Sequence, residues 1–265
     1  MSEFINTADV IGDDEMCDQI IMKTVTEYKE NRVKKIGPYA FYNCKNLTVV
    51  NAPNATSIEG YAFNGCTSLS EVNLPNISGI SGSLQFAGCT NLIRADFPEL
   101  VIPNHDTAVQ MFDGCSSLEY VNLPKANALG ANFFQNCKSL KSGVFPKVTQ
   151  IGHPSWRVCF GGCTNLRLLD FHSTLQIVPC FTNCNSLVAI ILRSNTMCGL
   201  YSAPSGKTDY GAPISSGTGY FYVPSALYDT YLAATNWSTI PSQIRKLEDY
   251  TIDGTITGAL DESKI

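Results

Sequence analysis

Four cysteines in two neighbouring stretches have the residue type and spacing that a metal site would use. Cys159 and Cys163 are four residues apart, and so are Cys180 and Cys184. Four thiols from two adjacent segments could bind zinc tetrahedrally. In five similar phrases, however, the position of Cys159 and Cys180 holds mostly apolar residues: Ala40, Ala62, Gln85, Met111 and Phe133. We therefore expect these thiols to be interior residues, and the sequence predicts no metal site.

Seven of the eleven cysteines occupy one equivalent position in a recurring phrase, Phe-x-(Asn/Gly)-Cys-x-x-Leu. They are Cys44, Cys66, Cys89, Cys115, Cys137, Cys163 and Cys184, at intervals of 21 to 26 residues. A residue that recurs once per turn faces one interior strip, where a free Cys behaves as a small hydrophobe. Parallel Cβ vectors also suit a disulfide poorly. We expect a buried, reduced column, which favours folding in a reducing compartment.

The histidines and the charge pattern do not indicate an active site. His105, His153 and His172 fall in different repeats, and none has an evident acid or nucleophile partner. The chain has no phosphate-binding loop, nucleophile elbow or His-Glu-x-x-His sequence. Its net charge is −5 and it has no basic stripe, which argues against nucleic acid as a partner. The sequence predicts a protein that is not an enzyme and uses no cofactor.

Short repeated units are the elements that position these residues. A period of 20–50 residues indicates a solenoid, in which each unit buries its apolar side by stacking on its neighbours. Within residues 56–75, the Leu-x-x-Val-x-Leu spacing that begins at Leu69 is typical of the strand of a leucine-rich repeat. Ile58 should point inward on the return path, and Tyr61–Phe63 should form a short helical turn that Gly65 ends. The predicted fold is a leucine-rich repeat solenoid with a parallel sheet and seven repeats.

The chain divides into four segments around these repeats. They are an N-terminal helical cap over residues 1–35, the leucine-rich repeat solenoid over 36–193, a loop and C-terminal cap over 194–249, and a short polar tail over 250–265. The N-terminal cap should contain an amphipathic helix that follows the acidic run Asp13–Glu15. The C-terminal cap should combine a strand at Tyr220–Val223 with a helix that Ser225 caps and that runs through Ala234.

The residue pattern of the repeats resembles that of the BspA-like leucine-rich repeat family. Ile36–Pro53 and Ile58–Pro75 match its phrase Ile-x-x-x-Ala-Phe-x-x-Cys-x-x-Leu-x-x-Val-x-Leu-Pro most closely. Ala8–Ile20 and Phe221–Trp237 are similar to the caps of phage- or gut-bacterium-encoded members. The resemblance covers about residues 8–248, and it implies the fold more than a function. Members are commonly bacterial surface proteins that bind host or partner-cell components, and others are encoded with phage structural genes.

The outward strand positions are the first candidate binding residues. On the exposed face of the sheet they form a row made of Glu71, Asn73, Arg94, Asp96, Tyr120, Asn122, Lys141, Arg167 and Asp170. The row is either a partner-binding face or a structural feature, which would be an amide ladder or a set of residues that simply tolerate solvent. Apolar Val188, Ala189 and Ile191 predict that the face of the last turn is covered, with the segment 194–219 as the candidate cover.

The segment 194–219 is the second candidate. Tyr201 and Tyr210 lie among Gly and Ser residues, a composition similar to that of antibody recognition loops. The alternative is a cap crossover with buried tyrosines. The irregular return segments Val101–Gln110 and Gly152–Val158 are further places where binding loops could protrude.

These observations predict a non-enzymatic binding or structural module. The leading hypothesis is a phage virion or tail component that contacts a host surface, because the chain starts without a secretory signal. A bacterial BspA-like cell-surface adhesin is the alternative, and a cytoplasmic protein-interaction scaffold is a third. The expected partner is a protein or glycan on a cell surface. Membrane insertion is not expected, because no apolar run approaches spanning length. The expected location is a virion or a cell surface.

Overall fold

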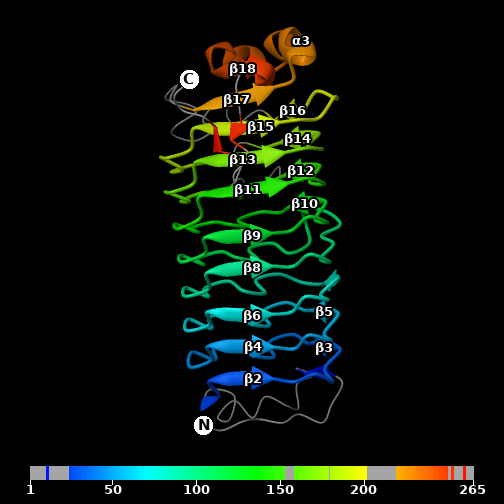
Figure 1. Cartoon of the computed structure of the whole chain (residues 1–265), viewed down its shortest axis with the longest axis vertical. Helices are drawn as coiled ribbons and strands as arrows, with labels where there is room; N and C mark the ends of the chain where they lie inside the picture. Colours follow the sequence, from blue (N-terminus) through cyan, green and yellow to red (C-terminus); the bar gives the residue numbers. More distant parts are fainter. Residues whose placement is uncertain are drawn as a thin grey trace.

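The computed structural model describes residues 10–11, 24–152, 158–178, 180–201, 219–249, 252–253 and 259–260. Over these residues the chain winds into an elongated solenoid, with successive turns stacked along its long axis (Figure 1). The helix expected after Asp13–Glu15 falls on residues 12–23, which lie outside the described residues. The leucine-rich repeat solenoid that the repeats predict is confirmed.

One parallel strand from each turn builds the main face of the solenoid. The strands are β2 (Glu27–Lys29), β4 (Val49–Asn51), β6 (Glu71–Asn73), β8 (Arg94–Asp96), β9 (Tyr120–Asn122), β11 (Ser142–Phe145), β13 (Leu168–Phe171), β15 (Ala189–Leu192), β17 (Tyr220–Val223) and β18 (Ile244–Lys246). They hydrogen-bond as three parallel sheets, β2-β4-β6, β8-β9 and β11-β13-β15-β17-β18. All seven strands that the repeats predict are present, from β4 to β15. Strand β2 lies ahead of residue 36, and β17 and β18 follow residue 193, so parallel stacking extends beyond the repeats at both ends.

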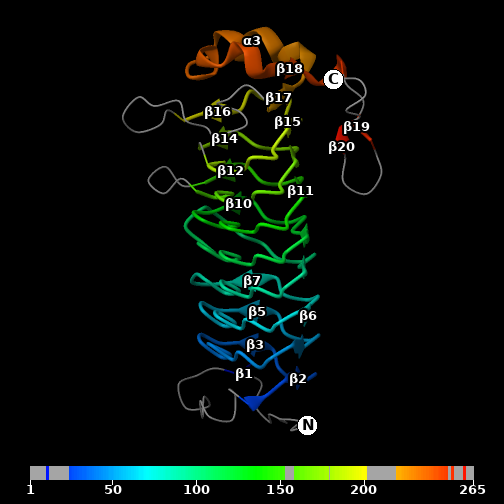
Figure 2. The ribbon, with the colours of Figure 1, turned by 90° about the vertical axis from the view of Figure 1, so that its left-hand side faces the viewer.

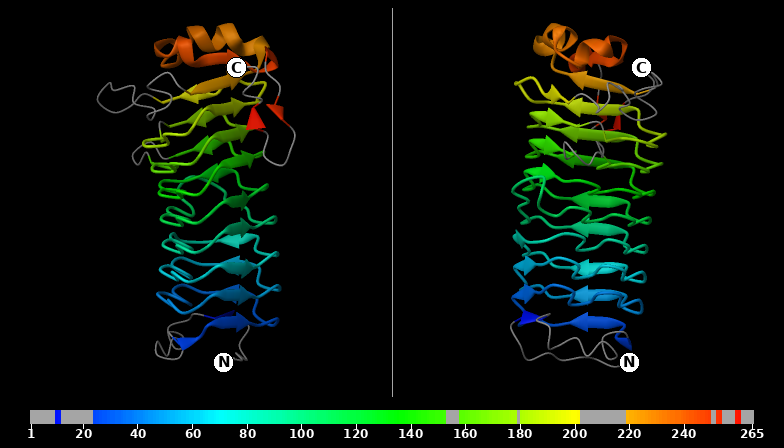
Figure 3. Two further views of the ribbon diagram at one scale, coloured as in Figure 1. Left: turned by 60° about the vertical axis from the view of Figure 1, so that its left-hand side comes forward. Right: turned by 180° about the vertical axis from the view of Figure 1, so that it is seen from behind.

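A second set of two-residue strands runs along another side of the solenoid (Figures 2 and 3). It consists of β1 (Val10–Ile11), β3 (Lys35–Ile36), β5 (Ser57–Ile58), β7 (Gly79–Ile80), β10 (Ala128–Leu129), β12 (Gln150–Ile151), β14 (Gln176–Ile177) and β16 (Gly199–Leu200). This ladder is interrupted between β7 and β10, where the return segment 101–110 contributes no strand. The break coincides with one of the two segments that the sequence marks as irregular.

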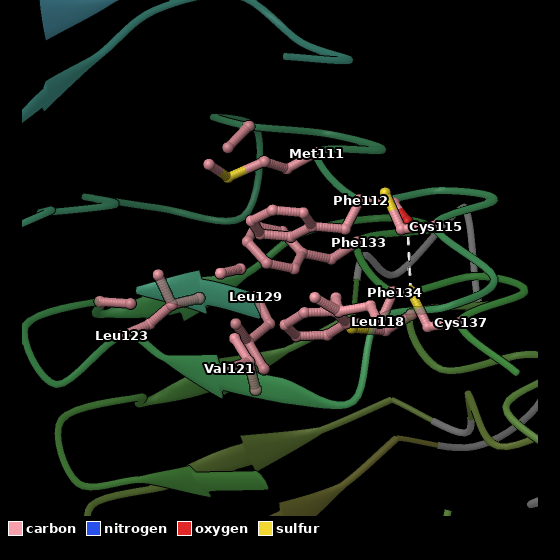
Figure 4. Close-up of a cluster of buried hydrophobic side chains, with 14 of the residues drawn as sticks. Met111, Phe112, Cys115, Leu118, Val121, Leu123, Leu129, Phe133, Phe134 and Cys137 are labelled. Atoms are coloured by element: carbon pink, nitrogen blue, oxygen red, sulfur yellow. Dashed lines mark hydrogen bonds between the residues drawn. The ribbon is translucent and has the colours of Figure 1, made fainter. Parts of the chain in front are cut away.

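The interior is built from three columns of identical residues. The seven Phe rings of the repeat phrase stack from turn to turn, and Phe41 and Phe63 have centroids 5.0 Å apart at an interplanar angle of 5°. Beside them the Cys column is fully buried, and each Sγ from Cys66 onward donates to the carbonyl of the Phe in the preceding turn. Figure 4 shows one such bond, from Cys137 Sγ to Phe112 O at 3.2 Å. The predicted inward Phe, Cys and Leu columns are confirmed.

The corner before each Phe differs from the expected short helical turn. Tyr61 has φ +60°, in the left-handed region, and Phe63 N donates to Gln85 O of the following turn at 2.8 Å. An α-helix would instead bond each amide to the carbonyl four residues earlier. The amides of this corner bond alternately within their own turn and to the next turn, so the backbone forms a chain of tight turns. Gly65 is left-handed at φ +75°, as the sequence predicts.

The C-terminal cap closes the last turn with short helices. They are η2 (Ser225–Leu227), α3 (Tyr228–Ala233), η3 (Trp237–Thr239), η4 (Pro241–Gln243) and η5 (Leu247–Asp249). The predicted strand and helix are confirmed, but Ser225 does not cap the helix: its backbone N and its Oγ both donate to the carboxylate of Glu248. Buried Trp237 donates from Nε1 to Cys198 O at 2.8 Å. The cap thus binds the backbone of the turn below it.

Candidate partner-binding face

The strand register brings most of the predicted binding residues together on the outer face of the main sheet. Arg94 is paired with Tyr120 and Asp96 with Asn122 across β8 and β9, while Asn51 is paired with Asn73 across β4 and β6. In a parallel ladder, paired residues project on the same side. The predicted row therefore exists as a physical row over successive turns.

Side-chain amides link this row from turn to turn. Asn73 Nδ2 donates to Asn51 Oδ1 at 2.8 Å, and Asn122 Nδ2 donates to Asp96 Oδ1 at 2.8 Å. Burial opposes ionisation of the Asp96 carboxyl, but hydrogen bonds from Asn122 and Arg94 outweigh it and hold its pKa below the usual range. The amide ladder that the sequence suggested is thus present as two separate links, one between β4 and β6 and one between β8 and β9.

Charged and aromatic side chains flank the ladder at β8, β9 and the start of β11. The Arg94 guanidinium lies 3.9 Å from the centroid of the Tyr120 ring and donates to Asp96 at 2.9 Å. In the next turn, Lys141 Nζ lies 3.9 Å from a carboxylate oxygen of Glu119. Tyr120 is 38% exposed. We call this surface the polar strip; its residues are Arg94, Asp96, Glu119, Tyr120, Asn122 and Lys141.

The other predicted residues of the row lie at the margins of the strip. Glu71 and Asn73 are exposed on β6, one turn before it, and Arg167 is exposed immediately before β13. Asp170 differs from the prediction, because only 4% of it is exposed. Arg193 binds its carboxylate with three hydrogen bonds of 2.8 to 3.0 Å. We therefore correct the role of Asp170 to one that is structural.

The outer face becomes apolar and closed toward the C-terminal end. Leu168, Ala189, Ile191 and Tyr222 form a separate buried cluster there, none more than 4% exposed. The antiparallel pair of β19 (Ile252–Asp253) and β20 (Ala259–Leu260) lies beside this part of the sheet (Figures 1 and 2). The covered face that the apolar residues predict is confirmed. The expected polar tail after residue 250 contributes this strand pair.

The predicted binding loop lies mainly outside the described residues. Tyr210 falls in the segment 202–218, which the structure does not describe. Tyr201 is half-buried, and its backbone N donates to Ile177 O at 3.0 Å. Tyr201 thus continues the stacking of the return ladder, and the proposed role of the loop stays a prediction.

Sequence reasoning missed a group of three tyrosines at the corner of the first two repeats. Tyr39 and Tyr61 stack with centroids 4.8 Å apart at 10°, and Tyr42 contacts both rings edge-on. Tyr39 is 49% exposed and Tyr42 is 43% exposed. Tyr61 also lines a cavity of about 600 Å³, with Gly82, Ser83, Leu84, Asp106, Val109 and Gln110 as its other lining residues. The available signal was the recurrence of Tyr two residues before Phe.

The cysteines lie where the repeat phrase predicts. Ten are free and buried, and burial raises the pKa of most of their thiols by disfavouring the thiolate. Such thiols are poor nucleophiles and poor metal ligands, because both roles require the thiolate. Among the described residues, no three His, Cys, Asp or Glu side chains are grouped as metal ligands. No helix in the described part of the chain has the length and apolar character needed to span a bilayer.

Comparisons with known proteins identify the family. A family model for the BspA type leucine rich repeat region matches residues 34–159 and 128–199 in six copies. The chain belongs to this family, and the seventh phrase of the sequence lies within the same matched span. Leucine-rich repeat proteins are typically non-enzymatic modules that mediate protein binding. No curated protein matches the chain.

One solved structure of a bacterial leucine-rich repeat protein shows the same fold, and two others are similar at lower TM-scores. A leucine rich cell surface protein from Faecalibacterium prausnitzii A2-165 is 18% identical, with a TM-score of 0.51 and 82% of each chain covered. The leucine-rich repeat protein of T. pallidum is 24% identical, with a TM-score of 0.37, covering 58% of this chain and 72% of that one. The pneumococcal vaccine antigen PcpA is 14% identical, with a TM-score of 0.42, and the match covers 84% of this chain and 66% of that one.

Proposed function

We propose that this chain is the binding module of a bacterial cell-surface adhesin and that it contacts a protein partner through the polar strip. The observation that carries this proposal is the stacked pair of Arg94 and Tyr120 at the middle of the open part of the sheet. Arg and Tyr are the residue types most enriched among those that dominate binding energy at protein interfaces. The bond from Arg94 to Asp96 holds the guanidinium in place before a partner arrives, which reduces the entropic cost of binding.

Two further features support this choice of surface. The bond from Asn122 to Asp96 joins the two turns that carry Arg94 and Tyr120, and the C-terminal part of the same face is already buried. The similar structure from Faecalibacterium prausnitzii is described as a cell surface protein, which supports the adhesin over a scaffold. A phage virion or tail component stays a prediction: neighbouring tail or baseplate genes would favour it, and an export signal in the native gene would favour the adhesin.

Binding of the labelled protein to intact bacterial and epithelial cells, measured by flow cytometry, tests the proposal. Tyr120→Ala and Arg94→Ala should each weaken binding by about tenfold, since hot-spot truncations cost at least about 1–2 kcal/mol. Leu175→Ala is the matched control, because Leu175 is an exposed hydrophobic residue away from the strip. Prior treatment of the cells with protease should lower binding, because it removes the protein partner. Unchanged binding by both strip variants, or equal binding to protease-treated cells, would refute the proposal.

A further inference from the structure

The corners of the solenoid contain two columns of residues with a left-handed backbone. The first lies two residues after the repeat Phe and is Asn or Gly in all seven repeats: Asn43, Gly65, Gly88, Gly114, Asn136, Gly162 and Asn183, with φ between +57° and +76°. Gly and Asn are the residues that adopt this conformation most readily, because others bring Cβ too close to the following carbonyl. In this first column the residue types therefore match the left-handed backbone.

The second left-handed column lies two residues before the Phe, and most of its residues are neither Gly nor Asn. It covers the first five repeats, and its residues are Tyr39, Tyr61, Leu84, Gln110 and Asn132, with φ between +54° and +60°. A bulky side chain in this conformation costs roughly 1–2 kcal/mol. Bulky residues in this conformation persist only where the surrounding structure holds them, and they cluster at functional sites in proteins. Since Asn132 shows that the column accepts Asn, the bulky residues in the earlier turns point to a role for their side chains.

The strained residues of this column line the cavity described above. Tyr61, Leu84 and Gln110 come from three successive turns, and the cavity lies between them at the break in the return ladder. Its volume of about 600 Å³ falls within the range of about 300–1,000 Å³ that is usual for small-molecule sites. Tyr39 stacks on the Tyr61 ring from the N-terminal side, so the cavity adjoins Tyr61 on its C-terminal side.

We propose that this cavity binds a neutral saccharide. Tyr61, Leu84 and Val109 supply an aromatic and aliphatic wall, against which the C–H face of a sugar ring can pack. Asp106 and Gln110 supply a carboxylate and an amide, which bond sugar hydroxyls. Gln110 Nε2 donates to Asp113 at 3.1 Å, and this bond orients the amide. The Asp106 carboxylate disfavours sialic acids and uronic acids, because like charges repel.

This site is separate from the polar strip, so one protein can bind a surface protein and a glycan at once. The tyrosine group continues the apolar wall outward from the cavity, because Tyr39 and Tyr42 are exposed and contact Tyr61. A chain of several sugar units could therefore extend from the cavity over the first two repeats.

A glycan array probed with the labelled full chain, followed by calorimetric titration of the hits, tests the inference. Neutral oligosaccharides should bind and acidic ones should not. Tyr61→Asn should weaken binding at least about tenfold, since an aromatic contact contributes about 0.5–1.5 kcal/mol beyond its buried area. Its urea midpoint should stay close to that of the parent, because relief of the left-handed strain offsets the lost ring contacts with Tyr39 and Tyr42.

Two further variants make the result decisive. The Asp106 side chain is exposed, so Asp106→Asn should not change folding. The saccharide affinity of this variant should fall. Tyr120→Ala on the polar strip should bind saccharide as the parent does, which separates this site from the protein-binding face. The inference is overturned if the parent binds no neutral saccharide on the array. It is also overturned if Tyr61→Asn and Asp106→Asn both bind saccharide with the affinity of the parent.

Discussion

Raising the pH should unfold this solenoid over a narrow range, because its core is lined with thiols. The pKa is raised by burial at seven of them: Cys66, Cys89, Cys115, Cys137, Cys163, Cys180 and Cys198. In the unfolded chain a thiol ionises at about pH 8.5. The folded state therefore keeps protons that the unfolded state releases. The stability from these thiols is fully present below about pH 8.5 and is lost as the pH rises toward the folded pKa values.

The size of the effect follows from the number of thiols. One pH unit above the pKa of a thiol in the unfolded chain, each thiol that stays protonated in the folded state lowers the free energy of unfolding by about 1.4 kcal/mol. For the seven thiols together the loss is on the order of 10 kcal/mol, which is comparable to the whole stability of a typical domain. We therefore expect loss of the folded state between about pH 9 and pH 10.

Urea unfolding at a series of pH values, followed by circular dichroism with a phosphine reductant present, measures this loss. Cys115→Ala is the informative variant, because Cys115 is fully buried and its Sγ donates to Phe86 O at 3.1 Å. At pH 7 the variant should be less stable by about 1–2 kcal/mol, from the small cavity and the lost bond. Above pH 9 its stability should fall less steeply than the parent's, by about 1.4 kcal/mol per pH unit.

Two results would refute this reasoning. One is a parent whose unfolding free energy stays flat from pH 8 to pH 10, and the other is a Cys115→Ala variant with an unchanged slope. The comparison is confined to values below about pH 10, where ordinary tyrosines begin to ionise. Burial also raises the pKa of Tyr28 and Tyr231, so these two residues would add their own loss above that pH.

Two substitutions test the contacts that close the C-terminal half. Trp237→Ala removes edge-to-face contacts with Phe221 and Tyr231 at 4.9 and 5.0 Å and should lower the unfolding free energy by about 3–5 kcal/mol; a urea midpoint equal to the parent's would show that the cap is dispensable. Asp170→Asn breaks the ion pair with Arg193 and should cost about 2 kcal/mol, less than a fully buried pair because Arg193 is one-third exposed. Since Asp170 is buried, 1 M salt should change this cost little, and a cost that vanishes in salt would contradict the burial.

The parts of the fold that the sequence predicts correctly are those that a local pattern determines. Phe63, Cys66 and Leu69 recur once per turn, so they must face the interior strip that every turn shares. The alternation of period two then assigns the next residues to the outer face, as β6 confirms at Glu71 and Asn73. Both inferences need only the spacing of residues within one repeat.

Other features were missed because they depend on contacts between turns. Tyr61–Phe63 has a sequence compatible with a helix, but bonds from its amides to the next turn override that local preference. Asp170 has the same position as the exposed Asn73, yet Arg193 follows it by one turn and covers its carboxylate. The register of two segments 23 residues apart decides that pairing, and a single repeat does not contain that information.

The two candidate sites lie in the part of the solenoid that the cap does not seal. The closed cluster of Leu168, Ala189, Ile191 and Tyr222 removes the C-terminal outer face from contact with a partner. Because each repeat is stabilised mainly by its neighbours, burial at one end supports the stack without using side chains of distant turns. Turns near Tyr61 and Tyr120 can therefore keep strained or exposed residues, since the repeated Phe, Cys and Leu columns supply their stability.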